Sequence, residues 1–197
     1  MINAILLLLN PVATWQRLAA AHRSILFLLA VHLLPLMLLA TAVEAWGLVH
    51  WGKPRGAFGQ AIPLATPLAV RYAVLKFAAQ LLVVFVAALA MTAIARSFRA
   101  RRGQFTAAFT LVAFALAPYF VVQMFHAVPV IPGWIVWVAA VTLACAPLYQ
   151  GVPQLLEPDP PLAFALYLMG AITFVGTTGL AHFVCELLLR QELLAAT

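Results

Sequence analysis

Six polar side chains near the ends of three apolar segments have the greatest potential for chemistry in this chain. They are Lys76, Gln80, Gln123, His126, His182 and Glu186. His182 and Glu186 are four residues apart, so on a helix they share one face. Ionisable groups at membrane depth are usually paired or face a cavity. We therefore expect these six side chains to form one polar cluster toward the outer ends of their segments.

Three kinds of site fit this cluster. The favoured one is structural, with an ion pair between Lys76 and Glu186 and with the histidines hydrogen-bonded across helices. The second is a polar cavity used for transport or proton movement. The third is a metal or haem site built from His126 and His182, with or without His50, since histidines at similar depth can ligate metals. The favoured structural site predicts no cofactor.

Sequence motifs of the common enzyme classes are absent. The chain has no HExxH, no Gly-x-Ser-x-Gly, no phosphate-binding glycine loop and no nucleotide fingerprint. It also lacks the paired intramembrane glutamates that membrane proteases use. We expect a protein that is not an enzyme.

The composition places this cluster in a membrane. Of the 197 residues, 66% are hydrophobic and only 8% are charged, with a mean hydropathy of +1.07. Such a chain cannot present a water-compatible surface. The net charge of +6 does not predict nucleic-acid binding, because the positive residues lie at the ends of apolar segments. Cys145 and Cys185 both lie in apolar runs and are expected to be packing residues.

Five apolar segments predict an all-α transmembrane bundle in a single integral-membrane domain over residues 1–197. The expected spans are residues 24–43, 68–94, 105–126, 134–149 and 161–188, each long enough to cross the hydrocarbon core. Asn10 and Pro11 favour a helix start, and Trp15 with Arg17 is typical of a helix in the headgroup region. The N-terminal helix is therefore predicted to be interfacial. The segment 44–67 is the longest external stretch, with room for a half-helix.

A compact basic loop between the second and third spans sets the orientation. It contains Arg96, Arg99, Arg101 and Arg102. Basic residues next to spans are retained on the cytoplasmic side, where these four also contact lipid headgroups. With five spans, the N-terminus is expected in the cytoplasm and the C-terminus in the periplasm.

Three short motifs resemble those of a known family. They are Asn10-Pro11-Val12-Ala13-Thr14-Trp15, Ala117-Pro118-Tyr119 and Leu148-Tyr149-Gln150-Gly151-Val152-Pro153. They are similar to the bacterial branch of the Yip-one domain family, the Ypt/Rab-interacting type of five-span membrane protein. Pro118, Tyr119, Tyr149, Gly151 and Pro153 are the family-like positions. The resemblance implies five spans, a cytoplasmic N-terminus and a bacterial inner-membrane protein without an established activity.

The functional expectation is a membrane scaffold or accessory subunit that binds other membrane proteins or lipid. Its partners would be the bilayer and other membrane proteins or further copies of the chain. Gly170, Gly176 and Gly179 of the fifth span are expected to allow close helix contact. The alternative is a small transporter or channel that uses Lys76, His126, His182 and Glu186.

Overall fold

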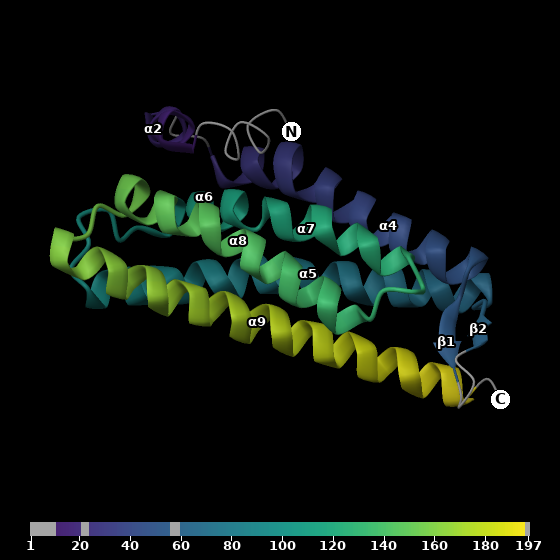
Figure 1. Ribbon diagram of the computed structural model, residues 1–197. Helices are drawn as coiled ribbons and strands as arrows, with labels where there is room; N and C mark the ends of the chain where they lie inside the picture. Colours follow the sequence, from purple (N-terminus) through teal and green to yellow (C-terminus); the bar gives the residue numbers. More distant parts are fainter. Residues whose placement is uncertain (1–10, 21–23, 56–59, 196–197) are drawn as a thin grey trace.

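The computed structural model describes residues 11–20, 24–55 and 60–195. Five of its helical segments are long and apolar enough to cross a membrane: Ile25–His50, Thr66–Ser97, Phe105–Ala127, Gly133–Leu155 and Pro160–Arg190. They run roughly along one long axis (Figure 1). The prediction of a five-span helical bundle is confirmed.

The first span contains a break in its helical geometry. It consists of α3 (Ile25–Phe27), a π-helical segment η1 (Leu28–Leu33) and α4 (Leu34–His50). Pro35 has no N–H to donate to the α-helical ladder, and the wider π-turns directly precede it. The helix continues to His50, beyond the predicted end at residue 43. Glu44 therefore lies within the span, not in the external segment where it was predicted.

A short hairpin connects the first and second spans. Strands β1 (Lys53–Arg55) and β2 (Gln60–Ile62) pair antiparallel, with Lys53 opposite Ile62. The hairpin was not predicted from the sequence, which left open whether this segment contains a half-helix. It leads into α5 (Thr66–Ser97), a longer helix than the predicted 68–94.

The last three spans differ in regularity. The third divides into α6 (Phe105–Ala115), α7 (Ala117–Gln123) and the 3-10 turn η2 (Met124–Ala127). The division falls at Leu116, just before Pro118, whose ring cannot continue the hydrogen-bond ladder. The fourth span, α8 (Gly133–Leu155), and the fifth, α9 (Pro160–Ala195), are continuous and longer than predicted.

The amino-terminal helix α2 (Pro11–Ala20) lies crosswise at one end of the bundle (Figure 1). Its Trp15 is completely buried, while Gln16 and Arg17 are exposed. The Trp15 ring meets Phe114 edge-on, with centroids 6.2 Å apart. This amphipathic helix fits the predicted interfacial position. Asn10, its predicted N-cap, lies outside the described residues.

The two loops at this end are joined to each other. The backbone N–H of Arg101 donates to the Glu157 carbonyl at 3.2 Å, and Arg102 forms an ion pair with the Glu157 side chain at 3.0 Å. We call this the basic end. The opposite end, with β1, β2 and the loop 128–132, is called the hairpin end.

Mostly apolar side chains pack the basic half of the bundle, with His32, Thr92 and Thr110 as buried polar exceptions. Along the third span, every residue from Leu111 to Ala117 is apolar and no more than 1% exposed. Close packing of this kind excludes water. The polar cluster must therefore lie in the hairpin half.

Candidate functional site

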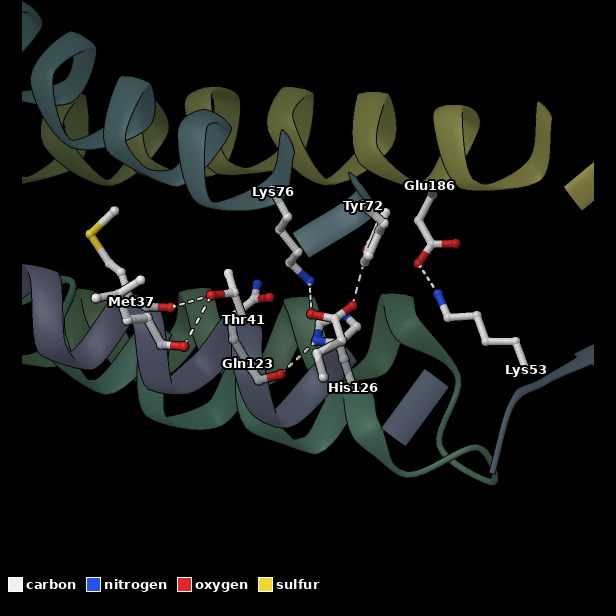
Figure 2. A network of polar contacts seen from close by, with 10 residues as sticks. Met37, Thr41, Lys53, Tyr72, Lys76, Gln123, His126 and Glu186 are labelled. Carbon is white, nitrogen blue, oxygen red and sulfur yellow. Dashed lines mark hydrogen bonds and ion pairs between the residues drawn. The ribbon is translucent and has the colours of Figure 1, made fainter. Parts of the chain in front are cut away.

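A buried ion pair between α4 and α5 forms the centre of the polar region. Lys76 donates to Glu44, whose other carboxylate oxygen accepts from the Tyr72 hydroxyl at 3.0 Å. Lys76 and Tyr72 are four residues apart and extend from one face of α5, as Figure 2 shows. Glu44 is 1% exposed and Lys76 is 6% exposed. Two charges this deep persist because each neutralises and hydrogen-bonds the other.

Thr41, one turn before Glu44 on α4, does not extend this network. Its hydroxyl donates to the carbonyl oxygens of Met37 and Leu38 in its own helix, at 2.9 and 3.1 Å (Figure 2). The donor capacity of the threonine is used within its helix. The ion pair is thus completed from α5 alone.

Two buried amides and a histidine continue the polar region beside the ion pair. Gln80 lies one turn after Lys76 on α5, and Gln123 and His126 come from α7 and η2. All three side chains are at most 5% exposed. His126 Nδ1 lies 3.1 Å from the Gln123 carbonyl oxygen. Because a carbonyl can only accept, Nδ1 is the donor, and the neutral ring keeps Nε2 as an acceptor.

A second, shallower ion pair lies nearer the hairpin. Lys53 of β1 and Glu186 of α9 are 2.6 Å apart, with side chains 20% and 25% exposed. Figure 2 shows the two side chains reaching toward each other from different elements. The predicted Lys76–Glu186 pair is therefore wrong, because each residue has a different partner. The charge of Lys76 is already neutralised by Glu44, inside the span that the prediction ended too early.

The Glu44–Lys76 pair with its neighbouring amides and the Lys53–Glu186 pair form two polar layers. His182 links these layers. Its ring lies 5.5 Å from that of His126 and stacks on Trp137 of α8 at 6.1 Å, centroid to centroid. The Trp137 indole N–H donates to Thr178 at 3.2 Å. The position of His182 between η2 and α8 is thus set by ring packing.

Two pockets adjoin these layers. The outer one has a volume of about 290 Å³ and is lined by Lys53, His126, Glu186 and the residues 128–133. We call it the vestibule. The inner one has a volume of about 20 Å³, and Lys76, Gln80, Gln123 and His182 contribute to its wall. Together they place polar groups along the hairpin half from its end to the buried ion pair.

The six residues singled out from the sequence thus fall into two neighbouring layers. Glu44 and Tyr72 were missed. Glu44 is followed by the apolar run Ala45-Trp46-Gly47-Leu48-Val49, and that run was the signal that the helix continues through it. A lone lysine inside a span also predicts an acidic residue at the same depth.

The described residues contain no group of three His, Cys, Asp or Glu side chains arranged to hold a metal ion. His50 instead stacks on Trp46, with ring centroids 4.5 Å apart, and contacts the carbonyl oxygen of that residue. The version of the metal or haem hypothesis that includes His50 therefore finds no matching geometry in the part of the chain described.

Three of the five family-like positions are buried, and Gly151 among them serves packing between elements. A Cβ atom on Gly151 would lie 2.4 Å from Leu111 Cδ1 and 2.8 Å from Trp15 Cζ2. The glycine of one motif thus makes room for the tryptophan of another. Pro118 and Tyr119 are buried, whereas Tyr149 and Pro153 are exposed.

The four arginines of the basic loop lie at the basic end, away from the polar cluster. Arg102 pairs with Glu157, and Arg96 donates to the Gly103 carbonyl at 3.2 Å. Arg96, Arg99, Arg101 and Arg102 are all exposed. Their position leaves them available to anionic groups at that end.

The comparisons with known proteins give one match. A family model described as the Yip1 domain matches residues 5–188. No curated protein and no solved structure matches the chain.

Proposed function

The chain belongs to the Yip1 domain family, and on this premise we propose that it is a non-enzymatic scaffold or accessory subunit of the bacterial inner membrane. The Yip1 family is not a known enzyme family. The proposed role is to bind another membrane protein through the lipid-facing surface of α5 and α9. The observation that carries this proposal is an apolar groove between those two helices.

The orientation follows from the arginines. The basic end lies on the cytoplasmic side, because exposed arginines beside spans are retained there. The hairpin end then faces the periplasm. With five spans, the N-terminus is cytoplasmic and the C-terminus periplasmic.

The groove between α5 and α9 is lined mainly by apolar side chains. It has a volume of about 220 Å³. Leu82 on α5 and Leu180 on α9 are 64% and 67% exposed at its rim. The full lining is Ala79, Leu82, Val83, Val86, Thr177, Leu180, Ala181 and Val184. Leucine and valine here meet only lipid or another apolar surface.

Small residues beside the groove favour a helix as its occupant. A Cβ atom on Gly176 would meet nothing within 4 Å, whereas one on Gly170 or Gly179 would meet Met91 or Trp137. The latter two glycines therefore serve contacts inside the chain. Gly176 and the neighbouring Thr177 leave a shallow surface on which another backbone can approach closely, as at many transmembrane helix interfaces.

Site-specific photocrosslinking tests this proposal. A photoreactive residue at Leu180 should give a discrete adduct with another membrane protein in native membranes. The same probe at Leu38, which is 54% exposed on α4, should not. Adducts with lipid alone, or only with a second copy of the chain, would contradict a role in binding a different membrane protein.

A small transporter or channel is the second candidate, favoured by the vestibule that reaches Glu186 from the hairpin end. Transport needs a path that continues through the basic half, where residues 111–117 are apolar and buried. Flux measurements on reconstituted protein test it. This candidate requires that Glu186→Gln abolish a measurable flux while folding and assembly persist.

A further inference from the structure

Four buried polar atoms in the hairpin half have no hydrogen-bond partner among the described residues. They are Nε2 and Oε1 of Gln80, Oε1 of Gln123 and Nε2 of His126. Each side chain is at least nine-tenths buried. A buried polar atom without a hydrogen-bond partner destabilises the folded protein, and proteins satisfy such atoms with protein groups or with bound water. Four such atoms in one region indicate a ligand that both donates and accepts hydrogen bonds.

The inner pocket identifies this ligand by size. Its volume of about 20 Å³ exceeds the ~10–15 Å³ needed for one water molecule and leaves no room for a larger solute. Its wall includes the amides of Gln80 and Gln123. A water molecule here finds the two to four polar partners that a buried water requires.

The vestibule lies beside this pocket, with one histidine in the wall of each. Lys53 and Glu186 at its rim are partly exposed, so water reaches it from the hairpin end. At Gly133, the first residue of α8, an added Cβ would lie 3.3 Å from Glu186 Oε1 and 3.6 Å from His126 Nε2. The absence of a side chain at Gly133 thus keeps the space between these two acceptors open. His126 lines the vestibule, and His182, 5.5 Å away ring to ring, lines the inner pocket.

We propose that the vestibule and the inner pocket form a one-sided water inlet. Water enters at the vestibule, passes Gly133 and the two histidines, and is held by Gln80 and Gln123 next to Lys76. Its inner end is the buried Glu44–Lys76 pair, and the apolar residues 111–117 close the basic side. The inlet gives a buried ion pair contact with water from one face of the membrane. It goes beyond the scaffold role and does not depend on it.

Radiolytic hydroxyl labelling of the full chain in lipid nanodiscs tests the inlet, because radicals formed from bound water label the adjacent side chains. Tyr119 and Cys185 line the inner pocket, and each is at most 5% exposed. After each rate is divided by the intrinsic reactivity of that side-chain type, both should label several-fold faster than Phe109 and Phe114, which are 0% and 1% exposed in the basic half. Equal labelling of the two groups would overturn the proposal.

Two variants locate the route. Gly133→Ala places a methyl group between Glu186 and His126, so labelling of Tyr119 and Cys185 should fall several-fold. Gly176→Ala is the matched control, since its Cβ meets nothing within 4 Å, and should leave labelling unchanged. If Gly133→Ala unfolds in a thermal melt, Gln80→Leu replaces it, because this variant removes the amide that holds the water. Unchanged labelling in a folded Gly133→Ala or Gln80→Leu variant would refute the inlet.

Discussion

At the residue scale, the two ion pairs of the hairpin half differ in depth. Glu44 and Lys76 are at most 6% exposed, whereas the side chains of Lys53 and Glu186 are 20% and 25% exposed. Removing one partner of a buried pair leaves an uncompensated charge that bulk water cannot solvate. Removing one partner of a partly solvated pair leaves a charge that water can still reach. The same chemical change should therefore have different effects at the two sites.

Glu44→Gln should lower the free energy of unfolding by about 3–5 kcal/mol, because Lys76 remains charged and buried. Glu186→Gln, the matched change in the shallower pair, should lower it by less than about 1 kcal/mol. Denaturant unfolding of the purified variants in the same detergent measures both values. Equal losses would show that the two pairs do not differ in depth as described.

The double variant Glu44→Gln, Lys76→Met should recover most of the stability lost in Glu44→Gln, because it leaves no charge unpaired. The same unfolding experiment measures it. A double variant no more stable than the single one would mean that the buried lysine is not the source of the loss.

The polar residues of this site were visible in the sequence, but their pairing was not. Lys76 and Gln80 were recognised because polar residues are rare within an apolar run. The same reasoning applies to any chain with such an apolar composition. Glu44 was predicted to lie outside the span because the polar residues after position 50 made the predicted loop begin too early. Which acid a lysine meets depends on how the helices cross, and hydropathy alone does not determine that crossing.

At the element scale, two glycines allow neighbouring elements to approach closely. A Cβ atom on Gly47 would lie 2.6 Å from both Cα and O of Ala127, so α4 and η2 touch without an intervening side chain. Gly151 on α8 admits the ring of Trp15 from α2. The first contact positions the polar layer, since Glu44 is one turn before Gly47 and His126 adjoins Ala127. The second holds α2 on the bundle.

Gly47→Ala should destabilise the protein by about 1–3 kcal/mol or more, which is the usual loss on overpacking. The new methyl group would meet backbone atoms of Ala127, and these cannot rotate away. Thermal unfolding in detergent measures this loss. Gly176→Ala is the control and should be neutral or stabilising by up to about 1 kcal/mol, because its added methyl group meets no atom of the chain and alanine favours the helix. A neutral Gly47→Ala would contradict the close crossing of α4 and η2.

Gly151→Ala should displace α2 while leaving the five spans assembled, because its methyl group would lie 2.8 Å from the Trp15 ring. Hydrogen exchange with mass spectrometry should then reveal faster exchange in residues 11–20, with unchanged exchange in α5. If exchange in α2 stayed at the level of the unaltered protein, Gly151 would not be the contact that holds it.

The number of spans was predictable because the apolar runs are separated by clear polar stretches. Their ends were less predictable, because helices continue past the hydrocarbon core into residues that hydropathy counts as loop. The hairpin β1–β2 lay in a segment where tryptophans, glycines and prolines obscure any alternating pattern. The π-helical turns before Pro35 depend on backbone hydrogen bonds that the amino-acid composition does not predict.

At the scale of the whole molecule, the two ends differ in their polar residues. The basic end holds four exposed arginines, while the hairpin end holds the vestibule and the Lys53–Glu186 pair. An odd number of spans places the two termini on opposite sides of the membrane. The orientation then decides which compartment the vestibule faces.

A fusion of alkaline phosphatase to the C-terminus should be active in bacterial cells, because this enzyme folds only in the oxidising periplasm and the arginines retain the basic loop inside. A fluorescent-protein fusion that matures only in the cytoplasm serves as the reciprocal reporter and should stay dark. The opposite pattern would reverse the proposed topology and turn the vestibule toward the cytoplasm.

The most direct test of the proposed role is purification in mild detergent followed by mass spectrometry of the copurifying proteins. The unaltered chain should retain a stoichiometric membrane-protein partner. Gly176→Leu should lose it by filling the surface beside the α5–α9 groove, whereas Ala42→Leu, the same kind of change at an exposed position on α4, should keep it. A chain that purifies without another membrane protein, or a partner that remains with a folded Gly176→Leu variant, would contradict the account.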